Sequence, residues 1–219
     1  MRIVLLTYPQ IVVNVRYGTK REKNSEMKAG IKNDRRTQKT KKLLATALVE
    51  LIIEKGYDAV TIQDIIDRAN VGRSTFYSHY ESKEQLLVGN INFQQSLIDL
   101  PAGDPENFPC GVNVSYLFQH TKQHLHLAKA LARTKGIELL SSYFAELCAA
   151  QIYDQLKKRL SVRASRAEQQ MTRYKAEASA GALIRMLFKW LADGATVPAE
   201  KMIEYANNVL INCFEASIG

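Results

Sequence analysis

Cysteine and proline are scarce in this 219-residue chain, and their positions exclude several classes of protein. The three cysteines (Cys110, Cys148 and Cys213) lie far apart, without a Cys-x-x-Cys pair. Such a dispersed, odd-numbered set argues against a disulfide scaffold or a zinc site and favours reduced thiols in a cytoplasmic protein. The five prolines fall at 9, 101, 105, 109 and 198. None interrupts a long periodic segment, so we expect an all-α protein.

Long apolar runs and catalytic motifs are also missing. The N-terminal stretch IVLLTYPQIVV is strand-like, is too short to cross a membrane and precedes no small-residue cleavage site. We therefore expect neither an export signal nor a membrane partner, and Met27 is a candidate start of translation. The sequence shows no Gly-rich phosphate loop, nucleophile elbow or pair of catalytic carboxylates. We expect no enzymatic activity and no cofactor.

Positive charge, in contrast, is concentrated near the N-terminus. Between Lys20 and Lys42, ten basic and three acidic side chains leave a net charge of +7, against +8 for the whole chain. Such a run suits a polyanion, and nucleic acid is the commonest one. A solvated, disordered tail would have the same composition. We expect residues 1–34 to form a basic, disordered arm.

Apolar periodicity predicts a series of helices. The first covers 37–55 and ends at Gly56, and the second follows Thr61, a good N-cap with Asp64 in its first turn. After a tight turn at 70–72 comes a short third helix. The pair Ser82 and Gln85 forms a capping box that opens a fourth helix, which we expect to reach about Ile98.

A loop at 99–111, rich in proline and glycine, separates these helices from the rest of the chain. Beyond it we expect helices over 114–133, with a break near His126, and over 137–160, 167–192 and 198–217. The fold class is therefore all-α, with about nine helices.

The second helix, the turn and the third helix have the dimensions of a helix-turn-helix. We expect Phe76 and Tyr80, four residues apart, to point inward. The opposite face of the short helix carries side chains suited to phosphate oxygens and base edges: Arg73, Ser74, Thr75, Tyr77 and His79. The alternative is that these residues only cap and cover a short helix.

The stretch AVTIQDIIDRANVGRSTFYSHYESKEQLL resembles the N-terminal signature of TetR-type transcriptional regulators. The Thr-(x)9-Val, Thr-Phe-Tyr, His-Tyr and Lys-Glu-x-Leu elements are all in register, and the resemblance covers residues 39–88. It implies DNA contacts from Gln63, Arg73, Ser74, Thr75, Tyr77, His79 and Lys83. Gly72 departs from the serine often found at that position, which removes one hydroxyl cap.

The resemblance also implies an organisation and a function. Residues 35–96 would form the DNA-binding domain with the start of the fourth helix, and 97–219 a helical domain for effector binding and dimerisation. The expected function is a sequence-specific transcriptional regulator, a repressor released by a small-molecule effector. The alternative is a constitutive, architectural DNA-binding protein without an effector. The expected partners are double-stranded DNA with a near-palindromic operator, a second copy of the chain and an unknown effector.

The second half offers candidate ligand residues. His120 and His124, with His126 beside them, have a spacing that can hold a metal, but HTKQH lacks the glutamate of the zinc-protease motif. We therefore expect surface or pocket-lining histidines and no metal. The candidates for the effector pocket each combine an apolar body with a polar tip: Tyr116, His120, Tyr143 and Trp190.

Two apolar stripes on the last helices suggest self-association. One stripe comprises Ala180, Leu183, Leu187, Trp190 and Leu191, beside the small residues SAGA at 179–182. The other comprises Ile203, Ala206, Leu210 and Phe214, widened by Met202, Val209 and Cys213. We expect both to pair with a symmetry mate in a four-helix bundle. The alternative is that both stripes are buried inside one subunit.

Overall fold

The computed structural model describes residues 7–8, 11–12, 27–89, 110–132 and 134–215. The chain divides into two compact units, Met1–Lys39 and Thr40–Gly219. In the first unit, strand β1 (Thr7–Tyr8) pairs antiparallel with β2 (Ile11–Val12), so the strand-like N-terminal pattern does form a short pair of strands. Helix α1 (Met27–Lys55) begins in this unit.

Helix α1 is longer than expected, since it begins at Met27 and not at Thr37. Residues 27–36 are mostly basic and polar and carry no apolar stripe, so periodicity could not reveal them as helical. Lysine and arginine are nonetheless good helix formers, so a helix can extend through such a run. The predicted end at Gly56 is confirmed: its φ is 78°, and its N–H donates to the Ile52 carbonyl at 2.9 Å.

The helix-turn-helix region follows in four short elements. They are the 3-10 turn η1 (Tyr57–Ala59), α2 (Ile62–Ala69), α3 (Arg73–Tyr77) and α4 (Lys83–Gly89). Their apolar side chains pack together with α1, on which Leu44, Leu48 and Ile52 are fully buried. Leu43, next to Leu44 in the sequence, is 42% exposed. The expected continuation of α4 to Ile98 lies outside the described residues.

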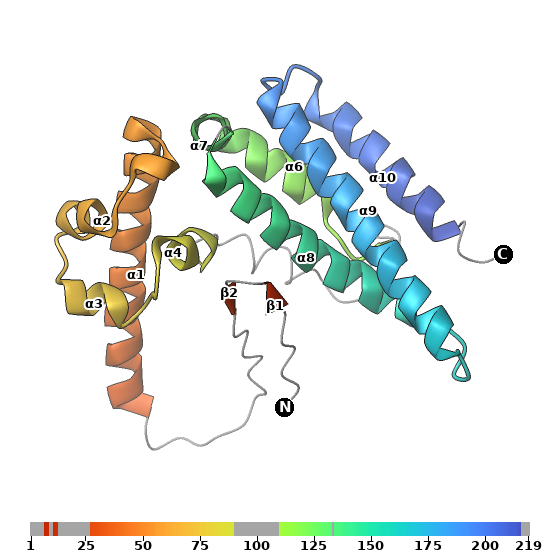
Figure 1. The fold of residues 1–219 in the computed structure, drawn as a ribbon, viewed down its shortest axis with the longest axis horizontal. Helices are drawn as coiled ribbons and strands as arrows, with labels where there is room; N and C mark the ends of the chain where they lie inside the picture. The colour runs from red at the N-terminus through yellow and green to blue at the C-terminus, as the bar shows by residue number, and fades with distance from the viewer. Residues whose placement is uncertain (1–6, 9–10, 13–26, 90–109, 133, 216–219) are drawn as a thin grey trace. The chain divides into compact units, whose positions relative to one another are not determined.

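The remaining helices agree closely with the predicted ranges. They are α6 (Val114–Gln123), α7 (Leu125–Leu131), α8 (Lys135–Lys157), α9 (Arg166–Ala192) and α10 (Ala199–Glu215). The predicted break falls at His124, which is both the C-cap of α6 and the N-cap of α7. Helix α8 packs along α9, and α10 packs on α6 and α9 (Figure 1). In the described part of the chain nine α-helices are present, which confirms the all-α fold class.

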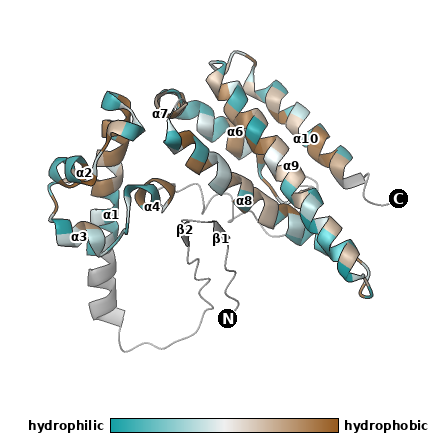
Figure 2. Cartoon of the chain, viewed as in Figure 1, coloured by the Kyte–Doolittle hydropathy of each residue, from teal (hydrophilic) through white to brown (hydrophobic). Residues whose placement is uncertain are grey.

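Apolar and polar residues interleave along α8, α9 and α10 (Figure 2). On α8 and α9 most of the buried side chains recur every three or four residues, as expected of one packed face. None of the helices within the described ranges has a stretch both long and apolar enough to cross a lipid bilayer.

The α9 stripe is buried within a single chain. Its five residues, Ala180, Leu183, Leu187, Trp190 and Leu191, are each at most 4% exposed. The expectation that they face a symmetry mate is therefore wrong, because the neighbouring helices of the same chain cover this face. On α10, Ala206 and Leu210 are buried as well. Its remaining stripe residues are more open: Met202, Ile203 and Val209 are half-buried and Cys213 is exposed, while the side chain of Phe214 is outside the described residues.

Candidate nucleic-acid interface

Helix α2 begins with a reciprocal pair of hydrogen bonds. The Asp64 backbone N–H donates to the Thr61 hydroxyl oxygen at 3.1 Å, and the Thr61 backbone N–H donates to Asp64 Oδ2 at 2.7 Å. Lys55 Nζ, at the end of α1, lies 2.8 Å from the same carboxylate oxygen. The hydrogen bonds from Lys55 and Thr61 hold the pKa of Asp64 well below its usual range. The predicted cap at Thr61 is therefore confirmed, and Lys55 connects α1 to it.

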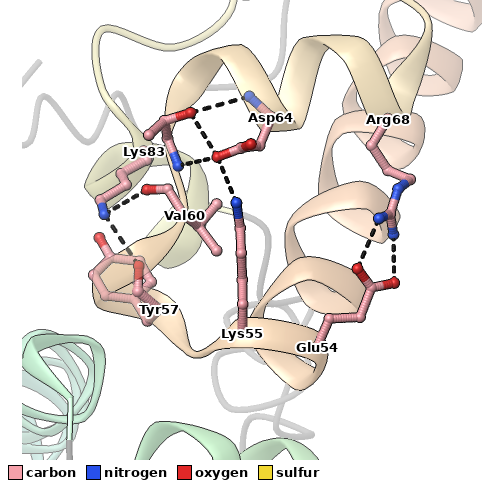
Figure 3. Close-up of polar contacts among 8 residues, drawn as sticks. Glu54, Lys55, Tyr57, Val60, Asp64, Arg68 and Lys83 are labelled. Carbon is pink, nitrogen blue, oxygen red and sulfur yellow. Dashed lines mark hydrogen bonds and ion pairs between the residues drawn. The ribbon is translucent and has the colours of Figure 1, made fainter.

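The other end of α2 is also attached to α1. Arg68 donates to both carboxylate oxygens of Glu54, each at 2.7 Å, and its Nη1 lies 3.4 Å from a carboxylate oxygen of Glu50. A guanidinium that binds both oxygens of a carboxylate fixes the orientation of the two groups as well as their separation. These two contacts, at Asp64 and at Arg68, hold α2 on α1 at both ends (Figure 3).

The turn between α2 and α3 has the tight geometry that the sequence predicts. Asn70 ends α2 in the left-handed conformation, with φ 51°, which asparagine tolerates better than most residues. The Val71 N–H donates back to the Ile66 carbonyl at 3.0 Å. Gly72 is the N-cap of α3 and provides no side-chain hydrogen bond, consistent with the missing hydroxyl noted in the sequence.

One face of helix α3 packs on the protein, and the opposite face is exposed. Phe76 is fully buried, Tyr80 is 6% exposed, and the two rings lie 6.2 Å apart between centroids. The predicted contact residues occupy the other side: Arg73, Ser74 and Tyr77 are exposed, and Thr75 and His79 are half-buried. His79 follows the last helical residue, Tyr77, so it lies on the turn after α3 and not on the helix itself.

Gln63 lies exposed on α2, where its side-chain amide donates to Asp67 Oδ1 at 2.8 Å. The structure thus places six of the seven predicted contact residues at exposed or half-buried positions on α2, on α3 or just after α3. The seventh, Lys83, has a different environment.

Lys83 is half-buried, and its ammonium donates to two backbone carbonyls. Nζ lies 3.1 Å from the Tyr57 carbonyl oxygen and 2.8 Å from that of Val60. It also lies 4.5 Å from the centroid of the Tyr57 ring, within the range of a cation–π contact. The Tyr57 hydroxyl donates to Glu84 Oε1 at 3.1 Å. Burial, and then the nearby Glu84 carboxylate, raise the pKa of Tyr57 above its ordinary value.

The predicted capping box at α4 forms only in part. The Gln85 N–H donates to the Ser82 hydroxyl oxygen at 3.2 Å, as expected. The Gln85 side chain accepts from the backbone N–H of Glu81, one residue before the predicted partner.

The effector-pocket candidates lie on three helices. Tyr116 and His120 stack on α6 with ring centroids 5.2 Å apart, and His120 is 4.7 Å from the His124 ring. Burial, and then the neighbouring His124, lower the pKa of His120. Trp190 packs against Phe118, and its indole N–H donates to a backbone carbonyl after α9, that of Val197, at 2.9 Å.

Tyr143 is buried on α8 with its ring 5.8 Å from Phe144. Within the residues that the structure describes, histidine, cysteine and carboxylate side chains do not gather in threes at any point that could hold a metal ion. Cys110 and Cys148 are buried, and burial raises the pKa of each thiol to about 12.

Two sequence families match this chain. Residues 44–89 match "Bacterial regulatory proteins, tetR family", and residues 113–212 match "Transcriptional regulator C-terminal region". The two matches together span more than half of the chain. The protein belongs to the TetR family. The resemblance seen in the helix-turn-helix signature is thereby confirmed, and the match beyond residue 98 extends it to the second half.

Relatives and solved structures agree with this assignment. The chain is 44% identical over 55 residues to the HTH-type transcriptional regulator YxbF of Bacillus subtilis, a match that spans 25% of this chain and only 14% of YxbF. A TetR transcriptional regulator from Streptococcus agalactiae has a similar structure, with 26% identity and a TM-score of 0.57 over 83% of this chain and 98% of that chain. The dihydroxyacetone kinase operon activator DhaS shares the fold, with 18% identity and a TM-score of 0.54 over 81% of this chain and 97% of that chain.

Sequence reasoning did not find Tyr57 and Glu84, the two residues that surround Lys83 in this TetR-family protein. One signal was available, since an aromatic residue directly after a helix-ending glycine has to pack back on the protein. The hydroxyl of Tyr57 binds a residue 27 positions away and its carbonyl a residue 26 positions away, separations that no local pattern covers.

Proposed function

We propose that this protein is a sequence-specific DNA-binding transcriptional regulator that uses α3 as its recognition helix. One observation supports this most strongly. Buried Phe76 holds α3 in place, while Arg73, Ser74 and Tyr77 beside it are exposed. A helix held in this way can enter the major groove of DNA and present its polar face to base edges and phosphates.

The chemistry of the exposed side chains suggests which of them contact bases and which contact phosphates and sugars. Arg73, on the first turn of α3, can donate in parallel to the O6 and N7 atoms of a guanine. We assign Ser74, Thr75, Tyr77 and His79 to phosphate and sugar contacts, which fix the register on the duplex. Gln63 would contact the backbone or a base edge from α2.

We further propose that a small molecule regulates this binding, so that the protein acts as a repressor released by its effector. The family match over 113–212 and the half-buried Tyr116–His120 ring pair support a ligand-responsive second domain. Because DhaS is described as an activator, the direction of control has to be measured. No step of this function requires catalysis or a cofactor, and we expect it to take place in the cytoplasm, where bacterial DNA lies.

We also propose a homodimer, because one short recognition helix reads too few bases to act alone. With the α9 stripe buried, the pairing surface has to come from other positions. The outer face of α9 offers the exposed residue Ala182 and the neighbouring Gly181, where an added Cβ would have nothing within 4 Å. Small residues let a second helix approach closely. A two-fold dimer would require a near-palindromic operator with half-sites about 34–36 Å apart or a multiple of that.

Binding of labelled duplexes selected from a random pool tests the recognition helix. Arg73→Ala should cost roughly 1–3 kcal/mol and should relax the preference at one base position. Arg163→Ala, at an exposed position between α8 and α9, is the matched control and should leave binding unchanged. If Arg73→Ala weakens every duplex equally, Arg73 contacts a phosphate and the base assignment is wrong. If the wild type shows no sequence preference, the architectural alternative holds.

A further inference from the structure

The position of Lys83 is unusual for a lysine. It is the first residue of α4, where the positive end of the helix dipole disfavours a cation. Its ammonium instead donates to the carbonyls of Tyr57 and Val60. Tyr57 begins the η1 turn, and Val60 follows this turn directly before Thr61, the cap of α2. A single side chain of α4 is therefore attached to the residues that begin the helix-turn-helix (Figure 3).

Tyr57 strengthens this attachment in two further ways. Its ring lies beneath the Lys83 ammonium, and its hydroxyl donates to Glu84, the next residue of α4. Tyr57 thus contacts α4 with its backbone carbonyl, its ring and its hydroxyl. Hydrogen bonds that involve a charged group, as both Lys83 bonds do, are stronger than neutral ones.

The turn that Lys83 binds is itself held firmly on its other side by α8. Tyr57 is 1% exposed and packs on Gly136, where an added Cβ would lie 3.0 Å from Tyr57 Cγ. Asp58 Oδ1 accepts the backbone N–H of Lys135, the first residue of α8, at 3.1 Å. The N-cap of α8, Thr134, makes no capping hydrogen bond with its own side chain, so Asp58 supplies an acceptor at this helix end.

We propose that Lys83 is a positioning residue that fastens α4 to the η1 turn, and that it supports DNA binding in this way and not through a phosphate contact. The inference rests on the proposed function, since it concerns how the recognition helix is held. It changes the role that the family resemblance implies for Lys83. Two of the three ammonium N–H groups already have protein acceptors, so at most one N–H is left for a phosphate oxygen.

Salt dependence separates the two roles. A lost phosphate contact lowers the slope of log K against log salt by about 0.9, because one fewer counterion is released. Lys83→Met keeps the length of the side chain and removes its charge and donors. We expect about a tenfold loss of affinity for the selected duplex, from the lost charged hydrogen bonds, with an unchanged slope. Arg73→Met, which removes the cation assigned to a guanine edge, is the comparison and should relax the preference at one base position, which Lys83→Met should leave unchanged.

Conservative variants test whether the contact itself matters. Lys83→Arg can donate to both carbonyls and stack on the Tyr57 ring, so it should recover most of the affinity. Tyr57→Phe keeps the ring and loses only the Glu84 bond, so it should have a smaller effect in the same direction. That effect should shrink when Lys83→Met is already present, because both changes loosen the same attachment.

Hydrogen exchange of the α4 amides gives a readout that does not depend on DNA. Lys83→Met should speed exchange over 83–89 more than in the helices after residue 110, and Lys83→Arg should not. If the salt slope falls by about one contact while α4 exchange stays unchanged, Lys83 is a phosphate contact and the proposal is wrong. If the wild type binds no duplex, the proposed function fails, while the exchange measurement still decides whether Lys83 fastens α4.

Discussion

The helix-turn-helix region and the helices after residue 110 are held together in different ways. Between α1, η1, α2 and α4, the contacts include charged and polar pairs such as Arg68–Glu54, Lys55–Asp64 and Lys83–Tyr57. In the described part of the second region, side-chain hydrogen bonds such as those of Thr121 and Thr172 stay within one helix, and the helices meet through apolar side chains.

This difference reflects how much apolar area each region can bury. Short helices bury little apolar area, so specific side chains have to fix their arrangement. Long amphipathic helices pack through any apolar side chains of about the right size.

The largest expected effect tests how well the apolar core of the second region tolerates a change of side chain. Leu187, 1% exposed on α9, should lose about 2–5 kcal/mol of unfolding free energy on change to Ala, because a cavity remains. Leu187→Met keeps the volume and should cost less than about 1.5 kcal/mol. Chemical denaturation measures both. A large loss in Leu187→Met would show that this core depends on shape as strictly as the first region.

The contact between η1 and α8 should respond to a single methyl group. In Gly136→Ala the new Cβ would lie 2.7 Å from Leu131 Cδ2 and 3.0 Å from Tyr57 Cγ. Overpacking costs about 1–3 kcal/mol, and the gain in helix propensity returns up to about 1 kcal/mol, so we expect a net loss of about 1–2 kcal/mol. Thermal unfolding measures the change, and an unchanged midpoint would mean that Tyr57 does not pack tightly on Gly136.

Gly181 provides the matched control for Gly136, since both are glycines in long helices. An added Cβ at Gly181 meets nothing within 4 Å. Gly181→Ala should therefore stabilise the isolated chain by about 0.5–1 kcal/mol. If a second copy packs on this face, the same change should weaken the dimer, which sedimentation at several concentrations detects. Stabilisation without any change in association would place the dimer contact elsewhere.

The smallest effect concerns pH. Hydrogen bonds from Lys55 and Thr61 lower the pKa of Asp64 in the folded protein below its ordinary value of 3.8. The unfolded chain then binds more protons in this range, so the stabilisation is present above about pH 4 and is lost as the pH falls below it. The difference in unfolding midpoint between the wild type and Asp64→Asn should shrink as the pH is lowered from 6 to 3. If the difference in midpoint stays constant with pH, the charge of Asp64 does not contribute, and its effect comes from hydrogen bonds that a neutral side chain can also make.

Local residue patterns are enough to predict the helices and most of their ends. The cap at Thr61, the stop at Gly56 and the break, predicted near His126 and found at His124, all depend on contacts between residues a few positions apart, which a local pattern records. The helix-turn-helix signature was readable for the same reason. The early start of α1 was missed, because residues 27–36 are helical without an apolar stripe.

Which surface each side chain meets could not be predicted in this way, because it depends on how the helices pack. The sequence shows an apolar stripe on α9 but cannot say whether another chain or the same chain covers it. In the structure, Leu187 and Trp190 are buried by helices of the same chain. The sequence likewise shows a lysine at the start of α4, and the structure directs its ammonium to carbonyls more than twenty residues away. Burial and pairing of this kind depend on elements that are distant in the chain and adjacent in space, and no local spacing of residues contains that information.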